Sequence, residues 1–232
     1  MVQRHLNRFN VPTSWPIKVK ERKWIARPMP GPTILRECIT INLIIKELLN
    51  YAKTTREVKK ILNDGKILIN NIIRKDHHFP VGLMDTISVP QLSKYYRLLI
   101  NKKGKFYLKE ISSEDATKKI CKIINKTILK SKKLQLNLFD GRSILIDKDE
   151  FKPSDSVLID LTSNKIKDHI KFEKGVLIYL TKGSHKGEIG ILQEIIKTLG
   201  SQEDRIKVKI ESKIVETFKK YAFVVGKDKP LI

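Results

Sequence analysis

Few side chains in this sequence are placed to perform catalysis or to bind a metal. The histidines His77 and His78 are adjacent, and the cysteines Cys38 and Cys121 lie far apart with no CxxC motif. A structural zinc site needs four converging ligands, usually supplied by closely spaced pairs. We therefore interpret the histidines as residues of a surface loop and the cysteines as buried thiols of a protein in a reducing compartment. No metal is expected.

Two further motifs suggest chemistry, and each has a simpler explanation. Asp140-Gly141-Arg142 superficially resembles the catalytic loop of RNA pseudouridine synthases, but the motif of those enzymes reads in a different order and lies in a larger catalytic domain. An Asp-Gly pair between two strands is typical of a hairpin turn. The glycines of Thr181–Gly187 lack the G-x-x-x-x-G-K-[ST] spacing of a phosphate-binding loop. The sequence therefore predicts neither an enzyme nor a cofactor.

Basic side chains, in contrast, are abundant in every part of the chain. The 232 residues contain 47 Lys and Arg against 25 Asp and Glu, a net charge of +22. Such a charge is relieved on a polyanion, so the prediction is a nucleic-acid-binding protein that uses several faces. A hydrophobic content of 41% is sufficient for packed cores. The sequence has neither an apolar run long enough for a membrane helix nor a signal-peptide core, and we expect a cytoplasmic protein.

The first 36 residues differ from the rest of the chain. They contain five of the nine prolines, both tryptophans, eight basic residues and one acidic residue. Proline removes hydrogen-bond donors and blocks helices, so we expect an extended arm that adds little to a core and is mobile in the free protein. Trp15 and Trp24 then stack either on the neighbouring domain or on unpaired bases. The arm residues expected to contact nucleic acid are Arg4, Arg8, Lys18, Lys20, Arg22, Lys23, Trp24, Arg27 and Arg36.

Residues 37–95 have the pattern of a small helical module followed by a β-hairpin. Apolar residues recur with helical spacing over Ile41–Ala52, and the T-x-x-E sequence Thr54–Glu57 is a capping box that begins a second helix. Asn70-Asn71 suits the two-residue turn of a hairpin. Basic residues cluster on the second helix and at the entry of the next strand, where we expect phosphate contacts. These residues are Arg56, Lys59, Lys60 and Lys66.

The remaining residues indicate mostly strands. Within residues 96–170 a basic loop separates two strands, and apolar residues at helical spacing predict a helix from about Ser113 through Ile124. Residues 171–232 have the pattern of a small all-β unit with a basic turn at Thr181–Gly187. The expected nucleic-acid contacts in this part of the chain are Lys102, Lys103, Lys105, Arg142, Lys182, His185 and Lys186.

The middle of this pattern resembles a known RNA-binding domain. Gly65–Asn70 resembles the G-x-V-x-V-N-G core of the S-four-type RNA-binding domain, and Val81–Val89 resembles its later V-x-x-G-D-x-I-x-V strand. Asn71 and Met84 stand where the general pattern has glycine. Both departures agree with one branch, the archaeal and eukaryotic small-subunit ribosomal protein family S-four-e.

The similarity to that family extends over essentially the whole chain, and its last part includes a segment that resembles a KOW motif. The resemblance implies an α+β, multidomain fold. Its parts are a basic N-terminal arm (1–36), an S-four-type α-helix and β-hairpin module (37–95), a mixed central domain (96–170) and a C-terminal SH3-like KOW β-barrel (171–232).

The resemblance also implies a function. A member of this family is a structural constituent of the small ribosomal subunit, which binds small-subunit rRNA and neighbouring ribosomal proteins and has no membrane or small-molecule partner. The alternative is a free RNA-binding translation or elongation factor, because S-four-type and KOW modules also occur in such proteins. An RNA-modifying enzyme is a third possibility, disfavoured because a catalytic domain is missing.

Overall fold

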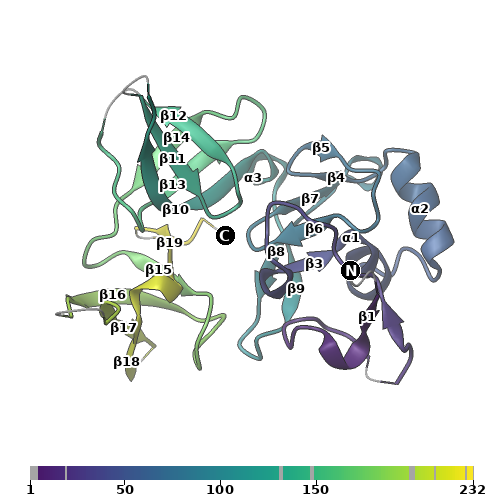
Figure 1. Cartoon of the computed structure of the whole chain (residues 1–232), viewed down its shortest axis with the longest axis horizontal. Coiled ribbons are helices and arrows are strands. Elements are labelled where there is room, and N and C mark those ends of the chain that lie inside the picture. The colour runs from purple at the N-terminus through teal and green to yellow at the C-terminus, as the bar shows by residue number, and fades with distance from the viewer. Residues whose placement is uncertain are drawn as a thin grey trace. The chain divides into compact units, whose positions relative to one another are not determined.

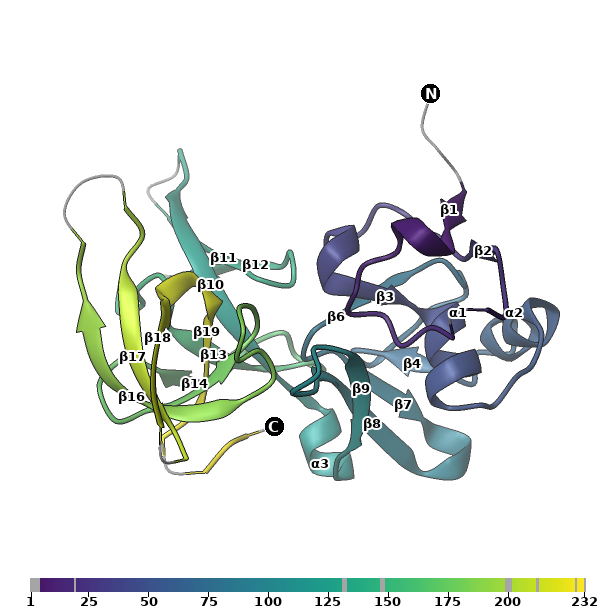
Figure 2. The same ribbon diagram turned by 90° about the horizontal axis from the view of Figure 1, so that it is seen from below.

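The computed structural model is a mixed α/β protein, rich in strands and with few helices. It describes residues 5–18, 20–130, 133–146, 149–198, 202–211, 213–227 and 229–231. The chain divides into two compact units (Figures 1 and 2). The first unit comprises Met1–Ile100 with Gly104–Lys119, and the second comprises Asn101–Lys103 with Ile120–Ile232. Within the described ranges, no helix is both long enough and apolar enough to span a bilayer.

The N-terminal arm is folded onto the first unit. Strand β1 (Leu6–Asn7) pairs antiparallel with β2 (Trp24–Ile25), and a short 3₁₀ turn follows β1. Trp15 is 1% exposed, and its indole Nε1 donates a hydrogen bond to the Cys38 carbonyl at 2.6 Å. The expectation that this arm adds little to the core is therefore wrong. A buried indole contributes a large apolar surface once its N–H finds an acceptor, which the main chain of Cys38 supplies.

Two helices follow the arm. Strand β3 (Cys38–Thr40) pairs with β6 (Pro80–Gly82), and α1 (Ile41–Leu43) begins directly after β3. The helix predicted here exists but widens into a π-helical segment, Ile44–Leu48, in which the Leu49 N–H bonds to the Ile44 carbonyl. Such a bond spans five residues instead of four.

Helix α2 (Thr55–Asn63) confirms the predicted capping box. The Thr54 hydroxyl accepts from the Glu57 backbone N–H at 3.3 Å, and the Glu57 carboxylate accepts from the Thr54 N–H at 3.4 Å. The box satisfies two N–H groups that would otherwise lack partners at the helix start. Val58 and Leu62, one turn apart, are completely buried against the core of the first unit.

The first five-stranded sheet has the order β5-β4-β7-β8-β9, all antiparallel. Its strands are β4 (Leu68–Ile69), β5 (Ile72–Ile73), β7 (Thr86–Val89), β8 (Lys94–Ile100) and β9 (Phe106–Glu110). Because β7 pairs with β8, the domain boundary predicted at 95/96 falls inside this sheet, and the compact unit continues to Lys119.

Two residues in the turns before β5 and before β7 occupy positions where the general RNA-binding pattern has glycine. Asn71 has a φ of 64° and Met84 a φ of 65°, so both retain the left-handed backbone that glycine adopts readily. Asn70, with a φ of 50°, completes the predicted two-residue turn between β4 and β5. The two departures from the pattern therefore change the side chain and keep the backbone conformation.

The helix predicted from Ser113 is mostly a strand. Helix α3 covers only Ser113–Ala116, and strand β10 runs over Lys118–Ile128. The apolar residues at helical spacing in this segment are largely isoleucines, whose β-branched side chains favour strands. Pairing of β10 with strands on both of its sides then decides the conformation.

The described part of the second unit contains two further sheets. The first has the order β12-β11-β10-β13-β14 and surrounds a small apolar core. Its remaining strands are β11 (Leu134–Leu138), β12 (Ser143–Ile146), β13 (Ser156–Asp160) and β14 (Ile166–Ile170). The predicted Asp140-Gly141 turn joins β11 to β12, with Gly141 at a φ of 78°.

The last sheet has the order β18-β17-β16-β15-β19 and its own apolar core. Its strands are β15 (Leu177–Leu180), β16 (Ile189–Ile196), β17 (Arg205–Ile210), β18 (Lys213–Phe218) and β19 (Ala222–Gly226). The basic turn between β15 and β16 contains Gly183 and Gly187, at φ values of 91° and 83°. These values explain why glycine occupies both positions.

Candidate nucleic-acid interface

Helix α2 presents a cationic face to solvent. Its buried face carries Val58 and Leu62, and the helical repeat therefore directs Arg56, Lys59 and Lys60 outward, where all three are exposed. Within the described part of the chain, none of the three forms an ion pair with a carboxylate. Exposed and unpaired cations within one or two turns can neutralise several phosphates of one nucleic-acid strand. Lys66, by contrast, is half-buried and lies 3.0 Å from the Asp64 carboxylate.

The basic residues of the arm fall into two groups. Exposed members are Lys18, Lys20, Arg22, Lys23 and Arg36, and half-buried members are Arg8 and Arg27. Two of the exposed cations already have acidic partners: Lys18 lies 3.0 Å from Glu21, and Arg22 lies 3.7 Å from Glu47. Arg8 packs its guanidinium over the ring of Phe9 at 4.8 Å. Arg4 lies outside the described residues.

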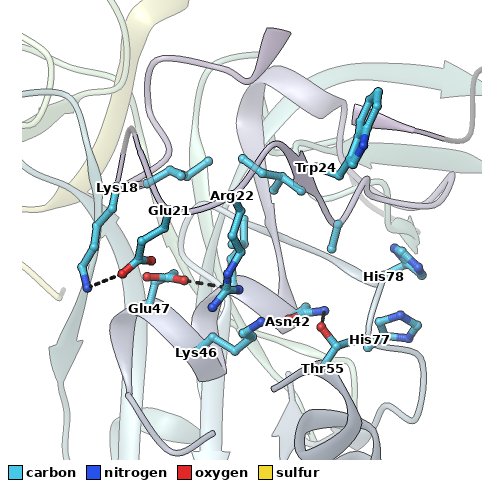
Figure 3. Close-up of a pocket in the computed structure, with 14 residues that line it drawn as sticks. Lys18, Glu21, Arg22, Trp24, Asn42, Lys46, Glu47, Thr55, His77 and His78 are labelled. Atoms are coloured by element: carbon cyan, nitrogen blue, oxygen red, sulfur yellow. Dashed lines mark hydrogen bonds and ion pairs between the residues drawn. The ribbon is translucent and has the colours of Figure 1, made fainter. Parts of the chain in front are cut away.

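The arm and the two helices enclose a cavity of about 290 Å³ (Figure 3). The arm supplies one wall, α1 with the π-helical segment supplies a second, and the start of α2 and the His77-His78 loop complete it. Trp24, 54% exposed, belongs to this lining, whereas Trp15 does not. The two tryptophans therefore differ in role: Trp15 is a core residue and Trp24 is available to a ligand.

The loop that carries the two adjacent histidines is bonded to the arm through His78. The ring centroids of His77 and His78 are 4.0 Å apart, and His78 Nδ1 lies 2.7 Å from the Arg27 carbonyl. Burial lowers the pKa of His77, and the nearby His78 and Lys59 lower it further. Both residues lie in the loop between β5 and β6, as predicted, and both are half-buried there. In the described residues, no group of three His, Cys, Asp or Glu side chains could hold a metal ion.

The basic residues predicted after residue 95 come from both compact units, and several of them form hydrogen bonds or ion pairs within the protein. Lys102 and Lys103 are exposed in the second unit, and Lys182 is exposed in the turn after β15. Lys105 donates to the Trp15 carbonyl at 3.1 Å in the first unit. Arg142 Nε lies 3.3 Å from Asp140, and His185 Nδ1 lies 3.0 Å from Glu188. Lys186 is half-buried in the same turn as His185.

The structure also places basic residues that the sequence analysis did not select. Lys46 is buried at the cavity, where burial and the charge of Arg22 lower its pKa. Arg74 lies over the Phe79 ring at 4.5 Å. Lys122 Nζ donates to the carbonyls of Lys220 and Ala222 at 3.0 and 2.7 Å, and burial, together with two nearby lysines, lowers its pKa to about 8. No local pattern distinguishes these residues from exposed lysines and arginines.

The cationic helix face and its hairpin sheet define an RNA-binding protein with an S4 domain, and a model of that domain matches residues 48–87. The model described as RS4NT (NUC023) domain matches residues 2–32, and that of Ribosomal family S4e matches residues 92–166. The chain belongs to the S4e family of ribosomal proteins, as the sequence resemblance indicated.

Similar proteins cover the whole chain. The small ribosomal subunit protein eS4 of Methanosphaera stadtmanae is 42% identical over 99% of this chain and 95% of its own length. The protein of the same name from Archaeoglobus fulgidus is 40% identical over 100% and 98%. A crystal structure of the 30S ribosomal protein S4e from Thermoplasma acidophilum aligns with a TM-score of 0.72 at 27% identity, covering 84% of this chain and 99% of that chain.

Proposed function

We propose that this chain is a structural constituent of the small ribosomal subunit that holds several segments of small-subunit rRNA on separate cationic surfaces. The observation that supports this proposal most strongly is the full-length similarity to proteins named as small ribosomal subunit proteins. The cationic face of α2 agrees with it, because its lysines and arginine are exposed and carry no internal ion pair among the described residues. The proposal assigns the chain to ribosomes, with rRNA and neighbouring ribosomal proteins as partners, and gives it no catalytic role.

The proposed RNA contacts differ in what each can contribute. Exposed cations contact phosphates and set the strength and salt dependence of binding. These are Lys18, Lys20, Arg22, Lys23, Arg36, Arg56, Lys59, Lys60, Lys102, Lys103 and Lys182. Partly buried residues position the RNA-facing segments while leaving part of the side chain accessible, and most of them have partners within the protein. These are Arg8, Arg27, Lys66, Lys105, Arg142, His185 and Lys186.

We also propose that residues 171–232 form an SH3-like KOW barrel. The five antiparallel strands with an apolar core support this assignment, as do the positive φ angles of Gly183 and Gly187 in the basic turn. In this proposal the turn between β15 and β16 presents Lys182 to an RNA strand. The central segment, residues 96–170, and the arm, residues 1–36, act as further RNA-binding modules.

Sedimentation tests the ribosomal assignment. A lysate of cells that express the tagged full-length chain is separated on a sucrose gradient in buffer of high magnesium concentration. We expect the tag in the small-subunit fraction, and in slower fractions after magnesium is removed. A chain that remains at the top of the gradient at high magnesium would instead be a free RNA-binding translation or elongation factor.

A further inference from the structure

The cavity between the arm and the first helices has the composition of a site for a flat, neutral group. Its lining includes two carboxylates, Glu21 and Glu47, which pair with Lys18 and Arg22. The two ion pairs nearly balance these four charges, and the remaining lysine of the lining, Lys46, is buried, with a pKa that burial and the charge of Arg22 lower. The charge that the cavity directs at a ligand is therefore small compared with that of the exposed cations around it. Figure 3 shows the two ion pairs on one side of the cavity, and Trp24, His77 and His78 on the other.

Aromatic groups are available to stack on such a ligand. Trp24 is 54% exposed, and the Lys23 ammonium lies 5.5 Å from its ring centroid. An exposed indole beside a cation is the combination with which proteins bind unpaired bases. His77 lines the same cavity, and its lowered pKa favours the neutral ring, which can stack without adding charge.

Polar groups in the cavity can recognise the edge of a base. Asn42 is 4% exposed, and its Nδ2 donates to Thr55 Oγ1 at 3.4 Å, a long bond. A side-chain amide has two donors and an acceptor carbonyl, so this single bond leaves Asn42 with capacity for both a donor and an acceptor on a ligand. Backbone bonds fix Asn42 itself, since its N–H donates to the His77 carbonyl at 3.2 Å.

We propose that this cavity binds one unstacked base of single-stranded RNA, with Trp24 stacking on the base and the Asn42 amide bonding to its polar edge. The proposal rests on the proposed RNA-binding function and adds the chemical class of group that the cavity takes. The adjacent phosphates then lie outside the cavity, on exposed arm cations such as Lys20 and Lys23. The arm therefore binds RNA by inserting a base as well as by charge.

The test uses two single strands with equal numbers of phosphates. One is a ten-nucleotide RNA of mixed sequence, and the other is the same ribose-phosphate backbone without bases. The affinity of the full-length protein for each strand is measured by the fluorescence anisotropy of a dye attached to the strand. Contact with Trp24 is followed separately by tryptophan fluorescence, since Trp24 is exposed and Trp15 is buried. We expect the base-bearing strand to quench the fluorescence of Trp24 and to bind at least fivefold more tightly than the abasic strand.

Two variants locate the effect. Trp24→Leu should remove the quenching and most of the preference for the base-bearing strand, while its affinity for the abasic strand stays within twofold of the wild type. Tyr107→Leu removes another exposed aromatic ring of the first unit, on β9, and should leave the preference intact. Circular dichroism spectra that match the wild type show that both variants are folded.

The outcomes separate the two proposals. Equal affinity for the two strands, with no effect of Trp24→Leu, would refute the base site and leave the RNA-binding function standing. Failure of both strands to bind at low salt would refute the RNA-binding function. Saturation of the same quenching by adenosine monophosphate alone, with no further effect of the RNA, would refute the RNA source and indicate a site for a free nucleotide.

Discussion

Lys119 Nζ lies 2.6 Å from Asp85 Oδ1, and both side chains are almost completely buried in the first unit. The same carboxylate accepts from the Asn70 side-chain amide at 2.8 Å and from the Gly82 backbone N–H at 2.7 Å. Asp85 therefore joins the hairpin turn before β5, the end of β6 and the beginning of β10. A buried carboxylate is tolerated only when it is paired and hydrogen-bonded in this way.

Removing only one partner of this ion pair should lower the stability of the protein substantially. Asp85→Ala removes the carboxylate that pairs with the buried Lys119 ammonium and accepts from the Gly82 N–H, and we expect the free energy of unfolding to fall by about 3–5 kcal/mol. Lys119→Met should cost about as much, because it leaves a buried carboxylate. Urea denaturation followed by circular dichroism measures both.

The double variant Asp85→Ala with Lys119→Met is the control for this pair. It removes both charges together, so its loss should be well below the sum of the two single losses. Additive losses would show that the two charges do not interact in the folded protein.

The second prediction concerns the two tryptophans of the arm. Trp15→Ala should lower the free energy of unfolding by about 3–5 kcal/mol, because it opens a cavity in the core of the first unit. Trp24→Ala should change it by less than about 0.5 kcal/mol, since that ring is mostly exposed. Deletion of residues 1–36 should destabilise the first unit for the same reason as Trp15→Ala. An unchanged melt of the deletion protein would mean that the arm is not packed in solution.

The cationic face of α2 should act through charge alone. Changing Arg56, Lys59 and Lys60 to alanine removes three exposed cations, and we expect the slope of log affinity for RNA against log salt to become shallower by about 2–3. The melting temperature should not fall, because alanine is a good helix former and none of the three is buried.

A matched control removes the same charge elsewhere. Lys94, Lys165 and Lys171 are exposed lysines outside the proposed contacts. Their replacement by alanine should change the salt slope by less than one unit. Equal effects of the two triple variants would show that binding depends on net charge and not on the α2 face.

The sequence predicted features that depend on neighbouring residues and failed where distant contacts decide. The capping box of α2 and the Asn70-Asn71 turn are local, and both were predicted correctly. The segment after Ser113 fits both a helix and a strand, and only its pairing with β11 and β13 selects the strand. Burial of Trp15 likewise depends on the Cys38 carbonyl, 23 positions away.

The candidate site shows the same division. The exposed face of α2 follows from the helical repeat opposite Val58 and Leu62, so its cations could be selected from the sequence. The cavity could not be predicted, because Trp24, Asn42 and His77 come from three separate segments. The sequence pattern also cannot show that Lys119 is buried among so many exposed lysines.

The turn between β15 and β16 provides a test of backbone conformation. Gly187 has a φ of 83°, and its N–H donates to the Leu180 carbonyl at 2.7 Å. Valine is strongly disfavoured at such an angle, so Gly187→Val should destabilise the last sheet by about 1–3 kcal/mol. Ser184→Val, in the same turn and without a positive φ, should have a much smaller effect. Hydrogen exchange of the β15 and β16 amides measures both, and equal protection in the two variants would contradict the assigned turn.

The last prediction follows from the environment of His77. Burial lowers the pKa of this side chain below 6.5, the His78 and Lys59 charges lower it further, and Asp76 acts in the opposite direction. The unfolded chain therefore binds a proton at this residue at a higher pH than the folded protein does. The free energy of unfolding should be fully retained above about pH 6.5 and should decrease as the pH falls through the lowered pKa.

His77→Gln isolates this contribution from the other titrating groups. Glutamine keeps hydrogen-bonding capacity at the cavity but does not titrate, so the variant should lose less stability than the wild type between pH 7 and pH 5. Urea denaturation at several pH values gives the two curves, and their difference reports only on residue 77 as long as the rest of the fold is unchanged. Parallel curves would mean that His77 has the same proton affinity in the folded and unfolded chain, and that its ring is not buried beside His78 in solution.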